Sequence, residues 1–198
     1  MASTNLPVTG PFNASIASSR LFTKLSGKLR NIIWKFALVG PHAIQFTRQG
    51  VQEPGLLTTC RLVRAEAGSV FYHENNSNLN CENFDSTSVV LAERKAELFS
   101  MRLRDPLFRY RVRLSITGTP HWANYILWMR RLHGQHKLCY SRITPNGTLG
   151  KVSLWTMSQI VKTMRTEPWA KVEQLLKLHR PMLVKCNSAW GGEHDQDS

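Results

Sequence analysis

Hydrophobic residues recur at intervals of three and four in two segments of the first third of the chain. The first series is Leu25, Leu29, Ile32, Ile33 and Phe36, and the second is Leu56, Cys60, Val63, Ala67 and Val70. This spacing predicts two amphipathic helices, one ending before Gly40-Pro41 and the other opening at Pro54-Gly55. Because neither helix is stable alone, we expect the two series to face each other in one core. Leu29→Asp is then expected to unfold the domain.

The next part of the chain has the composition of short strands and one helix. Residues 43–46 and 79–84 are predicted to be strands, and residues 75–80 form a polar loop. The sequence Asp85-Ser86-Thr87 offers side-chain oxygens that cap a helix, which we expect to run to about residue 100.

Strict alternation of apolar and polar residues predicts a half-buried strand over residues 108–117. Its apolar positions are Phe108, Tyr110, Val112, Leu114 and Ile116, and its polar positions begin with Arg109, Arg111 and Arg113. Thr119-Pro120 then predicts the start of a helix that Gly134 ends. The buried side of that helix is predicted to consist of Trp122, Ile126, Met129 and Leu132.

A hairpin and two helices are predicted to complete the chain. Residues 138–143 and 149–152 flank Pro145-Asn146-Gly147, whose residues favour the positive φ of a hairpin turn. Helical spacing follows in two series, Leu154, Met157, Ile160 and Met164, and then Trp169, Val172, Leu176 and His179. The last helix is predicted to open at Pro168 and to end at Pro181.

These elements predict an α+β fold in which an N-terminal helical segment precedes a small mixed sheet with packed helices. Residues 1–19 are expected to be a disordered tail, residues 20–84 the helical region, and residues 85–186 the α+β part of the same domain. Residues 187–198 are expected to be a disordered acidic tail.

The excess of basic residues suggests a binding function for the second half of the chain. The 198 residues include 26 Lys and Arg against 13 Asp and Glu, a formal net charge of +13. Such a field attracts polyanions, whether nucleic acid, an acidic protein surface or anionic lipid. On the predicted strand, Arg109, Arg111 and Arg113 share one face and suit phosphate contacts. Phe108 and Tyr110 point to the other face, so they do not offer a stacking platform on the same surface.

Cysteine usage and the N-terminal sequence bear on the compartment. Cys60, Cys81, Cys139 and Cys186 are far apart and form no C-x-x-C, which is typical of a reducing compartment. No secretory signal is evident, and no apolar run approaches the roughly 18 residues of a membrane span. We expect an intracellular protein of the cytoplasm or nucleus. The Ser/Thr-rich, acid-free segment before Glu53 also fits an organellar transit peptide, which is the alternative.

Catalytic motifs are absent from the sequence. It contains no G-x-S-x-G, H-E-x-x-H or G-x-G-x-x-G, and the Gly147–Gly150 interval is too short for a phosphate loop. We therefore expect a protein that is not an enzyme and has no cofactor. His133, His136 and Cys139 offer three zinc ligands, but a zinc site usually needs four, so we expect a basic helix end and no metal.

Two segments of the first half resemble a known family. Residues 25–38 are similar to the opening helix of fungal F-box-like proteins, Leu-Pro-x-Glu-(Leu/Ile)-Arg-x-x-Ile-(Tyr/Trp)-x-x-Ala-Leu. Residues 54–75 contain leucines, Cys-Arg, Arg-x-Glu and Phe-Tyr-x-x-Asn in the order of that family's second block. The related fungal domain named for its two Glu-x-Arg motifs shares this layout. The matching residues are Leu25, Leu29, Arg30, Ile33, Trp34, Leu56, Leu57, Cys60, Arg61, Arg64, Glu66, Phe71, Tyr72 and Asn75.

The resemblance implies a protein-interaction domain. In F-box proteins the Leu-Pro turn and the helices after it dock on a Skp-type adaptor of a ubiquitin ligase. Here the family's proline and glutamate fall on Ser26 and Lys28, and the glutamate of the second Glu-x-Arg motif falls on Leu62. We therefore expect weak or absent binding to such an adaptor.

The matching residues also have structural interpretations. Arg30, Arg64 and Glu66, with Arg61, suit ion pairs that position the two helices. Phe71-Tyr72 is expected to anchor the core, and Asn75 to end a helix because Asn tolerates left-handed backbone.

The sequence thus predicts a non-catalytic intracellular interaction domain of the F-box-like type, with the role of a degenerate ubiquitin-ligase adaptor as one form of that function. The alternative is a non-specific binder of nucleic acid or anionic surfaces that uses the basic C-terminal half.

Overall fold

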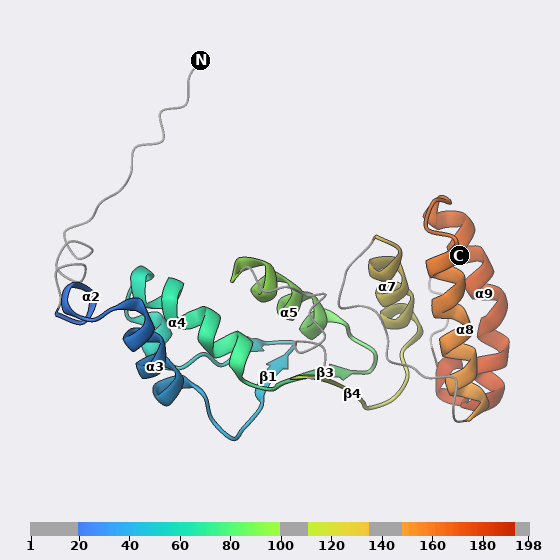
Figure 1. The fold of residues 1–198 in the computed structure, drawn as a ribbon. Coiled ribbons are helices and arrows are strands. Elements are labelled where there is room, and N and C mark those ends of the chain that lie inside the picture. The colour runs from blue at the N-terminus through green and yellow to red at the C-terminus, as the bar shows by residue number, and fades with distance from the viewer. Residues whose placement is uncertain (1–19, 100–110, 135–147, 193–198) are drawn as a thin grey trace, which may run out of the picture.

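The computed structural model describes residues 20–99, 111–134 and 148–192, which form an elongated molecule (Figure 1). One end is helical and contains α2 (Arg20–Lys24), α3 (Gly27–Leu38), the 3-10 helix η1 (Gly55–Thr58) and α4 (Arg61–Glu74). The middle contains the sheet and α5 (Thr87–Leu98). The far end contains α7 (Trp122–His133), α8 (Leu149–Thr163), α9 (Trp169–Cys186) and the 3-10 helix η2 (Ser188–Gly191). The predicted α+β class is confirmed.

The described strands form one mixed sheet. They are β1 (Ile44–Thr47), β2 (Gly50–Val51), β3 (Ser77–Glu82) and β4 (Val112–Thr117), in the order β2-β1-β3-β4. β1 is antiparallel to β2, and β3 is parallel to both β1 and β4. The predicted strand at residues 43–46 is confirmed. The predicted polar loop at residues 75–80 is wrong, because β3 already begins at Ser77.

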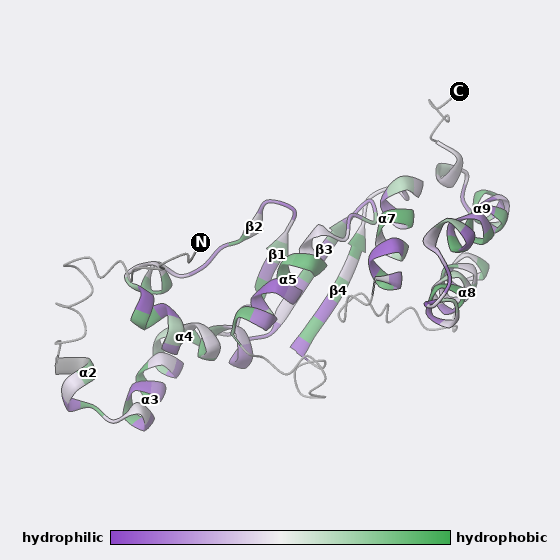
Figure 2. Ribbon diagram, turned by 90° about the horizontal axis from the view of Figure 1, so that it is seen from above, coloured by the Kyte–Doolittle hydropathy of each residue, from purple (hydrophilic) through white to green (hydrophobic). Residues whose placement is uncertain are grey.

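α5 covers one face of this sheet (Figures 1 and 2). Phe46, Leu79 and Cys81 point to that face and are buried. The alternate residues Asn80 and Arg113 are exposed. The outward positions of β3 are Asn and Glu, which have low strand propensity. For this reason the sequence did not reveal that the strand begins at Ser77.

An aromatic cluster joins the sheet to the C-terminal helices. The Phe84 ring lies 5.6 Å from Tyr125, 6.2 Å from Trp128 and 5.0 Å from Trp190, measured between ring centroids. Trp190 is 4% exposed, and it anchors η2 in this cluster. The predicted disordered tail from residue 187 is therefore wrong over Ser188–Gly191. The tails at residues 1–19 and 193–198 lie outside the described residues.

Several predicted boundaries in the second half are corrected. Residues 149–152, predicted as a strand, belong to α8, while residues 138–143 and the turn at 145–147 lie outside the described residues. Pro181 does not end α9, because Leu183 beyond it is fully buried and its packing continues the helix. α7 begins at Trp122 with His121 as its N-cap, two residues later than Pro120 suggested. The predicted buried side of α7 is confirmed at Trp122, Met129 and Leu132.

The second predicted helix is divided in two. Cys60 adopts an extended conformation between η1 and α4, and its Sγ accepts a hydrogen bond from the Val63 N–H at 3.3 Å. Cys60 is thus the N-cap of α4 and not part of its buried stripe. Val63, Ala67 and Val70 are buried as predicted. No helix in the described part of the chain has the length and apolar character to cross a bilayer.

Candidate protein-interaction face

α3 packs on α4 through the face opposite to the predicted one. Trp34 and Leu38 are buried at 3% and 6% exposure. By contrast, Leu29, Ile32 and Phe36 are 49%, 49% and 87% exposed. The prediction that this series meets the α4 stripe is wrong, and so is its consequence that Leu29→Asp buries a charge. Helical periodicity alone favoured the side that contains Leu29, Ile32, Ile33 and Phe36. The side that contacts α4 instead combines Trp34 with an arginine.

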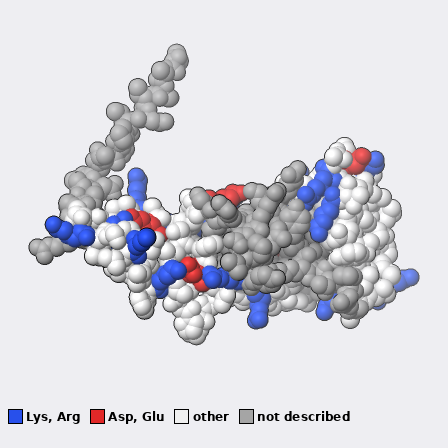
Figure 3. Space-filling model, in the orientation of Figure 1, with Lys and Arg blue, Asp and Glu red and all other residues white. Residues whose placement is uncertain are grey.

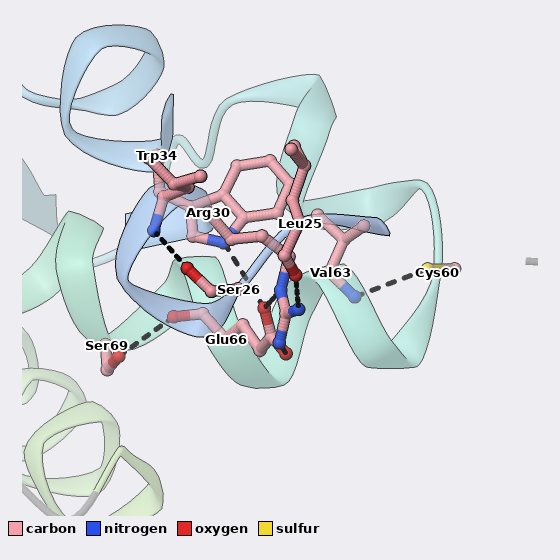
Figure 4. A network of polar contacts seen from close by, with 9 residues as sticks. Leu25, Ser26, Arg30, Trp34, Cys60, Val63, Glu66 and Ser69 are labelled. Carbon is pink, nitrogen blue, oxygen red and sulfur yellow. Dashed lines mark hydrogen bonds and ion pairs between the residues drawn. The ribbon is translucent and has the colours of Figure 1, made fainter. Parts of the chain in front are cut away.

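That arginine, Arg30, joins α3 to α4 through Glu66 (Figure 4). Its Nε and Nη2 donate to the two carboxylate oxygens of Glu66 at 2.8 and 2.7 Å, and its Nη1 donates to the Leu25 carbonyl at 2.7 Å. The Trp34 indole N–H also donates to Glu66, at 3.5 Å. The hydrogen bond from Arg30 lowers the pKa of Glu66, so the carboxylate stays charged. A bidentate pair of this kind fixes orientation as well as distance.

Asn75 joins the C-terminal ends of the same two helices. Its Nδ2 donates to the carbonyls of Leu38 and Phe71, both at 2.9 Å, and its Oδ1 accepts from the Gly40 N–H at 2.9 Å. The side chain is 4% exposed. Asn75 does end α4 as predicted, but its φ of −84° is extended. Its side-chain amide, not a left-handed backbone, is the reason that Asn suits the position.

Glu53 is the centre of a third group of bonds, which sequence reasoning missed. Its carboxylate accepts from Arg64 at 2.7 Å, from Lys95 at 2.5 Å and from the Tyr72 hydroxyl. Burial by itself raises the pKa of Glu53, but these three hydrogen bonds outweigh it and lower the pKa to about 2. Burial of the Tyr72 side chain and its hydrogen bond to Glu53 both raise the pKa of Tyr72. One signal was available: Glu53 is the only acidic residue among the first 65.

The family-motif residues therefore separate into two sets. The first set is buried or partly buried in the core, or is bonded to it: Leu25, Arg30, Trp34, Leu56, Leu57, Cys60, Arg64, Glu66, Phe71, Tyr72 and Asn75. Phe71 and Tyr72 are core residues, as expected. The second set, Leu29, Ile33 and Arg61, is exposed.

The positions that depart from the family pattern are also on the surface. Ser26 is the N-cap of α3 and accepts a hydrogen bond from the Leu29 N–H at 3.5 Å. Lys28 is exposed, and Leu62 is 38% exposed. Within the described residues, none of the three makes a side-chain hydrogen bond or ion pair between α3 and α4.

Four large apolar side chains thus lie on the outer side of α3. We call Leu29, Ile32, Ile33 and Phe36 the α3 apolar face. Basic residues flank it, among them Lys24 and Lys28, and residues 20–38 include no acidic residue. Lys35 is held at 2.9 Å from Glu74 of α4. Exposed apolar side chains of this size on one helix face are typical of a surface that binds another protein.

Of the three strand arginines, Arg111 does not face open solvent as the sequence predicted. Arg109 lies outside the described residues. Arg111 turns toward the end of α4, where its Nη1 donates to the His73 carbonyl at 2.6 Å and lies 3.5 Å from the Glu74 carboxylate. Arg113 is exposed on the polar face of the sheet. Basic side chains are visible at both ends of the molecule in Figure 3.

Of the three residues considered for zinc, only His133 belongs to the described residues. The His133 Nε2 atom lies 3.3 and 3.0 Å from the carbonyl oxygens of Met164 and Glu167, while His136 and Cys139 lie outside the described residues. Over residues 20–99, 111–134 and 148–192, no three His, Cys, Asp or Glu side chains are grouped to hold a metal ion.

Comparison with known proteins adds no relative: no family model, no curated protein and no solved structure matches this chain. The interpretation of the α3 apolar face therefore depends on the contacts and exposures given above.

Proposed function

We propose that this chain is a non-catalytic protein-interaction domain of the F-box-like type, and that the α3 apolar face is its binding surface. The observation that carries the proposal is the exposure of four large apolar side chains on one helix, with Phe36 at 87%. Covering a side chain of this size contributes about 1.5–3 kcal/mol. Because the four side chains are 38–87% exposed, covering them together contributes about 3–7 kcal/mol, which is close to the lower estimates of the entropy cost of association.

The spacing of the anchors indicates the kind of partner. Leu29, Ile32, Ile33 and Phe36 occupy positions i, i+3, i+4 and i+7, the pattern of a helix that binds in an apolar groove. The flanking lysines favour a groove with acidic residues at its rim. The other side of α3 is fixed by Arg30, Trp34 and Asn75, so the face is held in a single orientation before binding. Such preorganisation lowers the cost of association.

A Skp-type adaptor is the partner that the F-box-like resemblance implies, and the two departures in α3 argue for weak binding to it. Ser26 and Lys28 precede the α3 apolar face by one turn or less, so their chemistry bears on any partner of that face. Titration of a purified Skp-type adaptor into the wild-type chain is expected to show weak or no binding. The double variant Ser26→Pro, Lys28→Glu is expected to bind more tightly. Tight binding by the wild-type chain would instead assign it to a ubiquitin ligase.

The proposal is tested with two matched pairs of charge substitutions. Ile32→Asp with Phe36→Asp removes the α3 apolar face, while Leu98→Asp with Leu178→Asp changes two exposed residues elsewhere, at 64% and 76% exposure. Both double variants are expected to keep the wild-type melting temperature, because all four side chains are exposed. Quantitative affinity purification from the native cell is expected to lose its partner only with the first pair. Equal partner recovery with both pairs would contradict the proposal.

A second candidate function, polyanion binding, is favoured by the charge of the C-terminal part. The described residues 111–134 and 148–192 include 11 Lys and Arg but only two acidic residues, Glu167 and Glu173. Both acids are paired with a lysine one turn later. We infer that any nucleic-acid affinity of this part is non-specific and falls steeply with salt.

Fluorescence anisotropy with single-stranded RNAs of unrelated sequence measures this affinity across a salt series. The triple variant Arg113→Gln, Arg130→Gln, Lys151→Gln changes exposed residues only. It is expected to weaken RNA binding and to reduce the dependence of the affinity on salt. Arg111 is left intact because its bond to the end of α4 gives it a structural role. A sequence-selective complex that persists at high salt would contradict this candidate.

A further inference from the structure

A polar cavity of about 220 Å³ lies at the end of the sheet nearest α7 (Figure 1). Thr47 is the last residue of β1 and Glu82 the last of β3, and both line it. The cavity is therefore at the carboxyl ends of two parallel strands. This is the edge of an open sheet at which ligands usually bind, because the loops that follow the strands diverge there.

The wall of the cavity contains an unusual turn. Asn83 and Phe84 are consecutive residues with positive φ, 51° and 64°, which is uncommon for Asn and rare for a bulky side chain. The turn sends the Phe84 ring into the aromatic cluster, while Asn83 and Asp85 on either side of it line the cavity. Strained backbone that persists beside a cavity is a feature of functional sites.

Hydrogen bonds hold this wall in place. The Asn83 Oδ1 accepts from the Thr119 N–H at 2.9 Å, and the Asn83 carbonyl accepts from the Asn124 side chain at 3.0 Å. Asp85 accepts from the Thr87 N–H at 2.9 Å and so fixes the start of α5. Asn83, Asp85 and Asn124 therefore present their groups from a rigid frame.

Other polar groups of the cavity have no partner among the described residues. The Glu82 carboxylate and the Gln49 amide make no hydrogen bond or ion pair there, and Asn80 uses only its Oδ1, which accepts from Thr117 at 3.1 Å. Arg48 lies 3.5 Å from Asp85, but its side chain is 81% exposed, so this ion pair is weak. Several donors and acceptors are thus available to a ligand.

The chemistry of the lining selects the class of ligand. All eight lining residues have hydrogen-bonding side chains, four of them amides that both donate and accept. An apolar ligand would cover the Glu82 carboxylate and the Gln49 amide, which have no partner among the described residues. An anion would meet Glu82 and Asp85, and a cation would meet Arg48. Hydroxyl groups both donate and accept hydrogen bonds. A neutral ligand with several of them therefore suits the carboxylates, the amides and the guanidinium alike.

We propose that this cavity binds a neutral polyhydroxylated ring, of the size of one sugar residue. At about 220 Å³ the cavity is smaller than the roughly 300–1,000 Å³ of pockets for drug-sized ligands, which limits the ligand to about one ring. The proposal is independent of the α3 apolar face, which lies at the helical end of the molecule and not at this end of the sheet (Figure 1).

Two-dimensional NMR of the side-chain amides of the full chain is the direct test. Methyl glucoside, methyl galactoside and methyl mannoside represent a sugar residue of a glycan, and myo-inositol represents a free polyol. At least one of the four is expected to shift the amide signals of Gln49, Asn80, Asn83 and Asn124 in a saturable manner. The signal of the exposed Gln174 on α9 is expected to stay unchanged.

Variants then separate this cavity from general surface effects. Gln49→Ala and Asn80→Ala are each expected to weaken binding about fivefold, the loss of one neutral hydrogen bond. The matched control Gln174→Ala is expected to leave the affinity unchanged. Saturable binding of spermidine or argininamide without any binding of the four ring compounds would overturn the proposal, because the cavity would then be a cation site. The absence of any saturable shift would overturn it as well.

Discussion

Asn75 connects the ends of α3 and α4, so its replacement tests how firmly the two helices are joined. Asn75→Ala removes two hydrogen bonds donated to the carbonyls of Leu38 and Phe71 and one accepted from the Gly40 N–H, all at 2.9 Å. These backbone groups would lose a side-chain partner at a position that is 4% exposed. Water has little access there to replace the lost bonds.

The expected magnitude follows from these three bonds. Each contributes about 1 kcal/mol net, and a buried polar group left without a partner adds to the loss, which gives about 3–4 kcal/mol in all. For a chain of this size, each kcal/mol lowers the melting temperature by about 2–4 °C, so the expected decrease is roughly 6–16 °C. Such a change is a large part of the stability of an ordinary domain, about 5–15 kcal/mol.

Urea unfolding and thermal melts followed by circular dichroism measure the loss. Asn76→Ala is the matched control, because Asn76 is the next residue and its side chain is exposed. Asn75→Asp keeps the volume but replaces the donor by a carboxylate facing two carbonyl oxygens, so it is expected to cost at least as much as Asn75→Ala. If Asn75→Ala and Asn76→Ala differ by less than about 1 kcal/mol, the amide does not join the helices as described.

Three further predictions concern other contacts of the same end of the molecule. Because the pKa of Glu53 is lowered from 4.5 to about 2, its stabilising contribution is complete above about pH 4.5 and is lost as the pH falls toward 2. Melting temperatures should therefore fall over this pH interval, and Glu53→Gln should flatten that dependence; an equal slope in both proteins would contradict the bonds to Arg64 and Lys95. Gly68→Ala should destabilise the domain despite a helix-propensity gain of about 1 kcal/mol, because the new Cβ would overlap the Phe99 ring, and an increased melting temperature would show that this ring moves freely. Leu29→Asp should change the free energy of unfolding by less than about 0.5 kcal/mol, since Leu29 is 49% exposed, and an unfolded variant would place Leu29 in the core.

Periodicity predicted the presence of α3 and α4 but not the face by which α3 is packed. The outer side of α3 has more large apolar residues, Leu29, Ile32 and Phe36, than the inner side, which has Trp34 and Leu38. A prediction based on hydrophobicity alone therefore selects the wrong side as the buried one. The deciding residues are Arg30 and Glu66, which are 36 positions apart. Such a long-range polar pair leaves no mark in the local pattern of either helix, although the family resemblance did single out both residues.

Local signals also failed where tertiary packing overrides them. A proline normally ends a helix. Nevertheless, α9 continues past Pro181 to Cys186, because Leu183 is completely buried. Residues 149–152 were predicted to be a strand because they follow the turn-forming sequence Pro145-Asn146-Gly147, but they begin α8. The lining of the polar cavity could not be predicted either, because Asn80, Asn83 and Asn124 come together only through the parallel pairing of β3 with β4 and the position of α7.

The two sides of α3 explain why a helix with so much exposed apolar surface stays in place. Its inner side is fixed by directional bonds, the bidentate Arg30–Glu66 pair and the Asn75 amide, which do not depend on the apolar area of the outer side. Hydrophobic burial is non-directional, so a helix held only by its apolar residues would rotate to bury Phe36. Polar bonds prevent that rotation and keep the α3 apolar face outward. It follows that weakening the inner bonds should affect both stability and partner binding, whereas changing the outer residues should affect binding alone.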